Sequence, residues 1–330
     1  MKLKFNLLIL FESLLFINPF FAQISSKQTP LLSVGDKSPP LIIEKWIKGG
    51  GFSALEKGKV YVIDIWAIWC TPCIAGMPYL SKIQKNLKDK GVEIIGITSE
   101  DKSGNTLDRV EKFVQKKDSL MNYNVVWVPS SMNEDSLQGI FVHPWMQMIG
   151  NMNIPTAFIV DRNGFIAYIG DPHGIDMPLK EIANNTYNLE IARTKYQEGL
   201  KAKGLLENFN VAIRENKINE ELTIGNQILT DFSYVRSVTY LGLASAIVEM
   251  KGDIDTRLLD IALIAAKQGV VDTQFESPGY LDLLATVHAK KGDYFQAVVA
   301  EKLAVSVSEG VMKDNQMNNV KKYLLMIGRK

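Results

Sequence analysis

The sequence predicts an α/β domain with a mixed sheet, followed by an all-α domain of helical repeats. Three observations lead to this prediction. Short apolar strands alternate with helical stretches from residue 34 to about residue 180, and the pattern is helical from about residue 189 onward. Within the helical part, one motif recurs after 40 positions, at Tyr240 and again at Tyr280. A length of 330 residues also exceeds that of a usual single domain.

The first 22 residues fit a secretory signal peptide. Lys2 and Lys4 precede an apolar run over residues 5–21, and Ala22 ends the segment. An export signal places the mature protein in the periplasm or the cell envelope. Residues 23–33 are then a linker, and the α/β domain is expected over residues 34–187.

An uncleaved amino-terminal membrane anchor is the alternative to cleavage. Glu12 interrupts the apolar run, and Phe20 stands where a cleavage site prefers a small residue. The run is slightly short for a membrane span, which favours cleavage. Both interpretations predict an exported protein.

The strands of the α/β domain are predicted in chain order. Residues 60–66 are a nearly continuous run of β-branched and aromatic side chains, typical of a central strand buried on both faces. A helix follows, with Leu80, Ile83 and Leu87 at helical spacing and Gly91 to stop it. A strand over 92–97, a helix over 106–117 and a strand over 125–128 come next. The Asn-Gly pair at 163–164 joins strands over 156–160 and 165–169 as a hairpin, so the sheet is mixed.

The two cysteines of the chain, Cys70 and Cys73, lie at the junction between the buried strand and the helix after it. The first turn of a helix offers unpaired N–H groups and the positive end of the helix dipole, which stabilise a thiolate. Cys70 is therefore the candidate nucleophile. Cys73, one turn further, is placed to resolve a mixed disulfide formed at Cys70. Pro72 fits the first helical turn, where its missing N–H costs nothing.

Three motifs carry a resemblance to a known family. Residues 66–73 read Trp-Ala-Ile-Trp-Cys-Thr-Pro-Cys, residues 34–40 read Val-Gly-Asp-Lys-Ser-Pro-Pro, and residues 153–156 read Asn-Ile-Pro-Thr. Over about residues 34–183 the chain resembles the thioredoxin-like, exported thiol-disulfide oxidoreductases of the TlpA/ResA type. The resemblance implies a thioredoxin fold, with Trp69, Thr71 and Pro72 completing the active-site motif around the cysteines.

The resemblance also implies a substrate-binding segment. In the family, the proline that matches Pro155 is cis and lies against the cysteine pair. Cis peptide bonds are almost confined to X-Pro, so this geometry is plausible here. Ile154, just before it, would offer a bound substrate a strand edge.

Asp64 is the candidate proton acceptor and donor. It precedes Cys70 by six residues, as does the buried acid of thioredoxin, which the family implies accepts the proton of the resolving thiol. An ionisable side chain in an apolar central strand should have a pKa raised by desolvation, which suits a general base near neutral pH. The alternative is a strand-end aspartate bonded to backbone. The TlpA/ResA type usually has a glutamate where this chain has Gly76, so a relay through that residue is absent.

Other chemistries are disfavoured by the composition. The chain has 37 Lys plus Arg and 36 Asp plus Glu, a formal net charge of +1, so nucleic acid is not an expected partner. Zinc needs four ligands, but the chain has no third cysteine and its histidines, His143, His173 and His288, are scattered. We therefore expect no metal site and no cofactor beyond the Cys70–Cys73 disulfide.

The helical part, residues 188–330, contains two related copies of a motif. The Lys-Gly-Asp at 251–253 recurs at 291–293, each time after an apolar helix and before a second one. The second copy, with Tyr294, Ala297 and Ala304, resembles a tetratricopeptide repeat. The offset of 40 residues exceeds the 34 of that family. An irregular helical bundle is the alternative.

Two hypotheses of function follow. The first is an exported thiol-disulfide oxidoreductase, in the direction of a disulfide reductase, with protein thiols and disulfides as substrates. Its electron donor would be a membrane thiol-disulfide carrier, and its helical domain would dock a client or partner. The second is an interaction scaffold, in which the helical repeats bind a partner and the thioredoxin-like domain is mainly structural. The intact pair of Cys70 and Cys73 favours the first.

Overall fold

The computed structural model describes residues 32–129, 144–149 and 153–328. The predicted signal peptide, most of the predicted linker and His143 lie outside the described residues. Within them, no helix has both the length and the apolar character needed to cross a bilayer.

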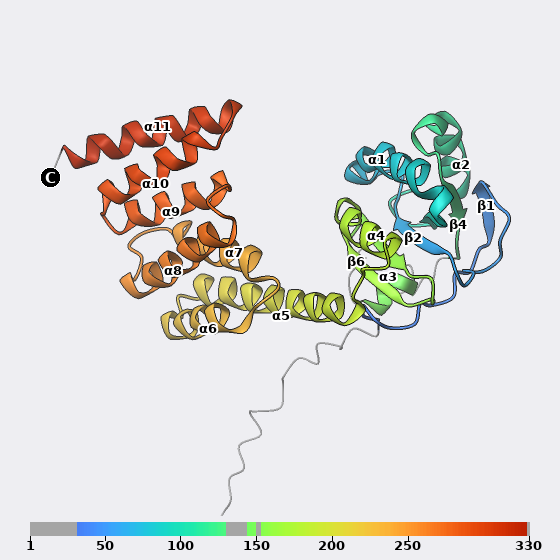
Figure 1. Cartoon of the computed structure of the whole chain (residues 1–330), viewed down its shortest axis with the longest axis horizontal. Helices are drawn as coiled ribbons and strands as arrows, with labels where there is room; N and C mark the ends of the chain where they lie inside the picture. Colours follow the sequence, from blue (N-terminus) through green and yellow to red (C-terminus); the bar gives the residue numbers. More distant parts are fainter. Residues whose placement is uncertain (1–31, 130–143, 150–152, 329–330) are drawn as a thin grey trace, which may run out of the picture.

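The described residues form a mixed six-stranded sheet in the order β1-β4-β3-β2-β5-β6. The sheet lies in the domain on the right of Figure 1. β2, β3 and β4 are parallel to one another, and the other pairings are antiparallel. The strands are β1 (Lys45–Lys48), β2 (Val60–Ile65), β3 (Val92–Thr98), β4 (Asn124–Trp127), β5 (Thr156–Val160) and β6 (Ile166–Gly170). The predicted α/β class and mixed sheet are confirmed, and β1 is a further edge strand that the sequence did not indicate.

Helices cover both faces of the sheet. One face packs under α1 (Thr71–Leu87), α2 (Leu107–Lys116) and α4 (Asp176–Ala183). The other face packs under the short α3 (Pro144–Met148) and the first turns of α5. The cysteine pair belongs to the core on the first face. Leu32, which lies in the predicted linker, is buried, and its N–H donates to the carbonyl of Met148.

The helix that carries the cysteines starts and stops for local reasons. Cys70 is its N-cap residue, and Pro72 stands in its first turn. It ends at Leu87, before a 3₁₀ turn over Lys88–Lys90 and then Gly91, whose φ of 76° is the left-handed conformation that glycine adopts without strain. The predicted stop at Gly91 thus ends the 3₁₀ turn and not the α-helix itself.

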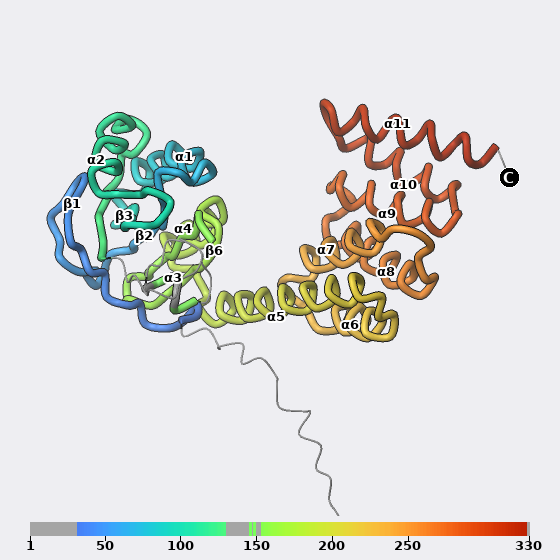
Figure 2. The backbone as a smooth tube through the Cα atoms, turned by 180° about the vertical axis from the view of Figure 1, so that it is seen from behind, coloured from blue at the N-terminus to red at the C-terminus, as the bar shows by residue number. Residues whose placement is uncertain are grey.

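The carboxy-terminal part is all-α, with helices stacked beside one another (Figure 2). Its helices are α5 (Leu189–Arg214), α6 (Ile218–Asp231), α7 (Arg236–Val248), α8 (Thr256–Asp272), α9 (Pro278–Lys290), α10 (Tyr294–Ser306) and α11 (Gly310–Ile327). α7 packs on α8, and α9 packs on α10. The all-α domain expected after the α/β domain is present.

The hydroxyls of both repeated tyrosines bond to an earlier helix. The hydroxyl of Tyr240 on α7 donates to the carbonyl of Leu229 on α6, and that of Tyr280 on α9 donates to the carbonyl of Ser237 on α7. Each one therefore ties its helix to an earlier helix of the stack. The copies differ at the next helix: Asp293 caps α10, but Asp255, beyond the Lys-Gly-Asp motif, caps α8. The tetratricopeptide-like character stays a prediction.

α5 belongs to both domains. Its first turns pack Leu189, Ala192 and Tyr196 against the core of the α/β domain. The guanidinium of Arg193 donates to the carbonyls of Val34 and Gly35 at 3.2 and 3.0 Å. Its later turns enter the core of the helical stack (Figure 1). A boundary at residue 188 therefore falls where α5 begins, but the contacts of the α/β domain continue further along this helix.

Candidate active site

Cys70 and Cys73 form a disulfide at the start of α1. The Sγ of Cys70 accepts a hydrogen bond from the backbone N–H of Cys73 at 3.2 Å. Thr71 and Pro72, the first residues of the helix, are exposed. When the bond is reduced, the free N–H groups of the first turn and the helix dipole favour a thiolate at Cys70. The structure thus places Cys70 where a nucleophilic sulfur is stabilised.

Access to the disulfide is narrow. Cys70 is only 3% exposed, whereas the neighbouring Trp69 is 41% exposed. The indole is therefore the large apolar surface that a polypeptide meets next to the sulfur atoms. This arrangement agrees with a role of Trp69 in the active-site motif.

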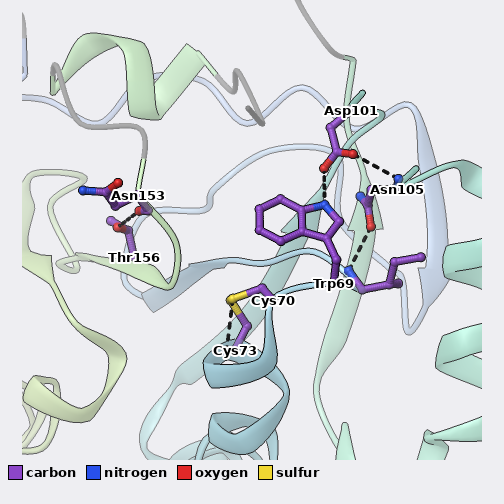
Figure 3. Close-up of a disulfide and its surroundings, with 8 residues drawn as sticks. Trp69, Cys70, Cys73, Asp101, Asn105, Asn153 and Thr156 are labelled. Atoms are coloured by element: carbon purple, nitrogen blue, oxygen red, sulfur yellow. Dashed lines mark hydrogen bonds between the residues drawn. A yellow bond between two sulfur atoms is a disulfide. The ribbon is translucent and has the colours of Figure 1, made fainter. Parts of the chain in front are cut away.

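The loop before the cysteines is held by polar side chains from the segment after β3 (Figure 3). The indole N–H of Trp69 donates to Oδ2 of Asp101 at 2.6 Å, and the backbone N–H of Ile68 donates to Oδ1 of Asn105 at 2.9 Å. The amide nitrogen of Asn105 in turn donates to the hydroxyl of Thr98 and the carbonyl of Ser99. The cysteine loop is therefore anchored on both its backbone and its largest side chain.

Sequence reasoning missed Asp101 and Asn105. The available signal was their position, since β2 and β3 are adjacent parallel strands whose carboxyl ends meet at one edge of the sheet. Polar side chains just after β3 must then lie beside the cysteine loop that follows β2. The sequence predicts both strands, but no local pattern shows that they are neighbours in the sheet.

Asp64 lies in the central strand and is 2% exposed. In the sheet register it stands between Gly96 on β3 and Ala157 on β5. Side chains alternate along a strand, so Asp64 points to the same face as Val62 and Trp66, which pack in the core under α1. The carboxyl group therefore lies on the face of the sheet that holds the cysteines.

The surroundings of Asp64 raise its pKa to about 7. Burial in the apolar core is the main cause, and the negative charge of Asp171 adds to it. Two polar groups are buried in the same region without a described hydrogen-bond partner, the indole N–H of Trp66 and the hydroxyl of Tyr123. Both rings lie over Gly96, where a Cβ would be 3.1 Å from each. A carboxyl group with a pKa near neutrality can accept and return a proton.

The predicted substrate segment lies at the same edge of the sheet. The peptide bond between Ile154 and Pro155 is cis. The next residue, Thr156, begins β5 and pairs with Ile65, the last residue of β2. Its hydroxyl donates to the carbonyl of Asn153 at 2.7 Å, which closes the turn (Figure 3). Ile154 is half-buried and packs against the core that contains the cysteines.

Comparison with known proteins places the first domain. Residues 35–169 match the AhpC/TSA family. Protein FixW of Rhizobium leguminosarum is 32% identical over 143 residues, which are 42% of this chain and 61% of FixW. The thiol-disulfide oxidoreductase ResA of Bacillus cereus is 25% identical over 137 residues, which are 40% of this chain and 66% of ResA. The thioredoxin-like protein YneN of Bacillus subtilis is 28% identical over 162 residues, 48% of this chain and 82% of YneN.

Solved structures of similar proteins include the thioredoxin domain of a thiol-disulfide oxidoreductase from Bacteroides vulgatus. It is 22% identical, with a TM-score of 0.36 and coverage of 48% of this chain and 99% of that one. A thiol:disulfide interchange protein of the thioredoxin family from Chlorobium tepidum is 20% identical, with a TM-score of 0.33 and coverage of 45% and 97%.

The chain spans less than two thirds of the length of FixW and of ResA. The family match ends at residue 169, before α5 and the helices that follow. Over the matched residues, the sheet order, the cysteine pair at the start of α1 and the similarity to the relatives all indicate a thioredoxin-like domain. Residues 35–169 form a thioredoxin-like domain that matches the AhpC/TSA family and is similar to the thiol-disulfide oxidoreductase ResA and to YneN.

Proposed function

We propose that the chain is a thiol-disulfide oxidoreductase, which exchanges its Cys70–Cys73 disulfide with cysteines of other proteins. The observation that supports this most is the disulfide at the first turn of α1, on the same face of the sheet as the buried Asp64. The relatives called ResA are named as thiol-disulfide oxidoreductases. The cysteine pair itself carries the two electrons when it is reduced, so the proposal includes no further cofactor.

The reaction has two steps. In the reduced protein, the thiolate of Cys70 attacks one sulfur of a client disulfide, which forms a mixed disulfide and releases the other client sulfur as a thiolate. Cys73 then loses its proton to Asp64 and attacks the sulfur of Cys70. The mixed disulfide breaks, the second client thiol leaves, and the Cys70–Cys73 bond is restored. Two electrons pass from the protein to the client.

Ile154 is proposed to hold the client during these steps. It stands outside the ladder of β5, at the edge of the sheet where the cysteine loop also lies. An extended client segment can pair with free backbone groups at such an edge. The exposed ring of Trp69 offers this segment an apolar contact.

The direction we propose is reduction of client disulfides. The dipeptide between the cysteines is Thr-Pro, as expected of a reductant of the TlpA/ResA type. We expect a reduction potential near that of thioredoxin, about −270 mV, and not near that of the strong oxidants at about −120 mV. Equilibration in glutathione buffers, with the Cys70–Cys73 disulfide quantified by thiol alkylation, measures the potential. A value near the oxidants would overturn the reductase direction.

The compartment and the electron donor are also part of the proposal. The basic and apolar character of residues 1–22 supports export to the periplasm or the cell envelope, with an uncleaved anchor as the alternative. A reductant in an oxidising compartment needs a source of electrons, which we assign to a membrane thiol-disulfide carrier.

The helical domain is proposed to dock the client. Along α10, Phe295, Val299 and Leu303 recur every four residues and are all exposed, so they form an apolar stripe on one face. Exposed apolar patches mark interaction surfaces more often than single exposed side chains do. A client held on this stripe would present its disulfide to the first domain of the same chain.

A trapping experiment tests the docking. In Cys73→Ser, the mixed disulfide at Cys70 cannot be resolved, so clients stay attached and mass spectrometry identifies them. Adding Phe295→Glu and Leu303→Glu to the trapping variant is expected to remove most trapped clients. A protein that carries Phe295→Glu and Leu303→Glu but keeps Cys73 should reduce a small-molecule disulfide at the wild-type rate. An unchanged set of trapped clients would contradict docking on α10.

A further inference from the structure

A row of small residues runs across the sheet from Asp64 towards its β6 edge. Asp64 on β2 is in register with Ala157 on β5, and Ala157 is in register with Gly170 on β6. Residues in register project to the same face. Within the sheet, one alanine and one glycine therefore separate Asp64 from the β6 edge, and the phenol of Tyr168 lies over that glycine.

The far end of this row is polar. Above Gly170 lies the hydroxyl of Tyr168, which would be 2.6 Å from a Cβ at that position. The same hydroxyl donates to the backbone carbonyl of Asp171 at 2.8 Å. Asp171 follows directly after β6 and is largely exposed. The row thus leads from a buried carboxyl group to an exposed one.

His173 is fixed beside Asp171. Its Nδ1 lies 2.9 Å from Oδ1 of Asp171, and its backbone N–H donates to the same oxygen at 2.8 Å. Its ring stacks on Tyr79 of α1, with centroids 5.2 Å apart and an angle of 21° between the planes. The side chains of His173 and Asp171 are 60% and 64% exposed. The imidazole is held in one orientation and still reaches water.

Gly76 allows this ring to approach the helix of the cysteines. Gly76 stands three residues after Cys73, so the two positions lie on the same side of α1. A Cβ at Gly76 would be 3.8 Å from Cε1 of His173, and a longer side chain would have to displace the ring. The imidazole therefore occupies the space beside α1 that a side chain at position 76 would otherwise take.

We propose that Asp171 and His173 are the surface pair through which the buried Asp64 exchanges its proton with water. The proposal rests on the proposed function and adds two residues to it. Cys73 can give its proton only to an ionised Asp64, so for the resolving step Asp64 must first release its own proton to water. His173 accepts it at the end of the row and releases it to solvent, while Asp171 orients the ring. Both are positioning residues, since they act through Asp64.

The charges in this region support the pairing. The carboxylate of Asp171 raises the pKa of Asp64 in addition to the effect of burial, because the two negative charges repel each other. Hydrogen bonds from His173 hold the pKa of Asp171 below its usual value, which keeps it ionised beside the ring. The other titratable groups that face Asp64 or the pair are Tyr79, Tyr123, Tyr168 and Asp176. Imidazole is the side chain that most readily exchanges protons near neutral pH.

His173→Gln and Asp171→Asn in the full chain test the proposal, with His288→Gln on α9 as the matched control. The reduced protein is mixed with insulin in weak buffer, and release of the client thiol is followed across pH. We expect His173→Gln to slow the resolving step about tenfold near neutral pH, and Asp171→Asn to slow it less. Free imidazole, added at constant pH and ionic strength, should restore the rate of His173→Gln. The control should match the wild type, with or without imidazole.

The outcomes separate this inference from the function on which it rests. A wild type that does not reduce insulin contradicts the proposed function. An active wild type with an equally fast His173→Gln, and the same pH profile, contradicts this inference alone. A slow His173→Gln that imidazole does not rescue also contradicts it, because that result indicates a structural role. Circular dichroism of each variant confirms that the fold is kept.

Discussion

Cys70→Ser is expected to abolish the reduction of insulin disulfides. Serine keeps the N-cap position, since its hydroxyl can accept the hydrogen bond from the N–H of Cys73. It has no thiolate and cannot form the mixed disulfide. The rate should fall at least about 1000-fold, to that of the uncatalysed reaction. Turbidity of precipitating insulin chains, with dithiothreitol as the electron source, measures this.

Cys73→Ser is the matched control for this experiment. It should accumulate a mixed disulfide with insulin, visible on a non-reducing gel, whereas Cys70→Ser should form none. If Cys70→Ser and the wild type reduce insulin equally well, the catalytic function fails. The scaffold interpretation, in which the helical repeats bind a partner and the first domain is structural, would then take its place.

Asp64→Asn is expected to stabilise the oxidised protein in a pH-dependent way. The pKa of Asp64 is raised from 3.8 to about 7, chiefly by burial. Because the folded-state pKa exceeds the unfolded one, this group imposes no penalty below pH 3.8, and stability is lost as the pH rises towards 7. Above that pH the loss is about 4 kcal/mol, at 1.36 kcal/mol per pKa unit. Urea unfolding of variant and wild type at several pH values measures the difference.

The comparison has a clear control. Asp89→Asn changes an exposed carboxyl group and should leave the free energy of unfolding within about 0.5 kcal/mol of the wild type at every pH. A stabilisation of Asp64→Asn that does not grow between acid and neutral pH would contradict a buried carboxyl group with a raised pKa.

The same substitution is expected to slow catalysis. Asparagine cannot take the proton of Cys73, so the resolving step should slow about 100-fold near neutral pH. The wild-type rate should rise with pH through about 7 as Asp64 ionises, and the variant should lack this rise. A variant that is more stable and also slower would show that Asp64 lowers the stability of the fold but is needed for proton transfer from Cys73.

The parts of the fold that depend on local pattern were predictable. The run over 60–66 predicted the central strand, and the Asn-Gly pair at 163–164 predicted the hairpin of β5 and β6. β1 was missed because its Lys-Trp-Ile-Lys sequence has charged ends and only four residues. Its register comes from pairing with β4, far away in the chain, which no local pattern contains.

The candidate site shows the same limit. Cys70 and Cys73 were identified from their spacing at the start of a helix, and Asp64 from its place in a buried strand and from the resemblance to thioredoxin. Asp101 lies in the loop after β3, and His173 lies in the segment after β6. Both are close to the helix of the cysteines only because of the order of the strands in the sheet, which the local sequence does not give. In the sequence, His173 was one of three scattered histidines and had no assigned role.

The sharing of α5 between the two cores has a mechanical consequence. A helix of 26 residues is about 39 Å long, at 1.5 Å per residue. Arg193 binds the first turns of α5 to the α/β domain, and the later turns pack in the helical stack. A rotation of one domain relative to the other must therefore bend α5 or break the packing at one of its ends. The stack and the disulfide are therefore held at a set spacing. If the stack docks a client, as proposed, that client can bring to Cys70 only those cysteines that lie within this distance.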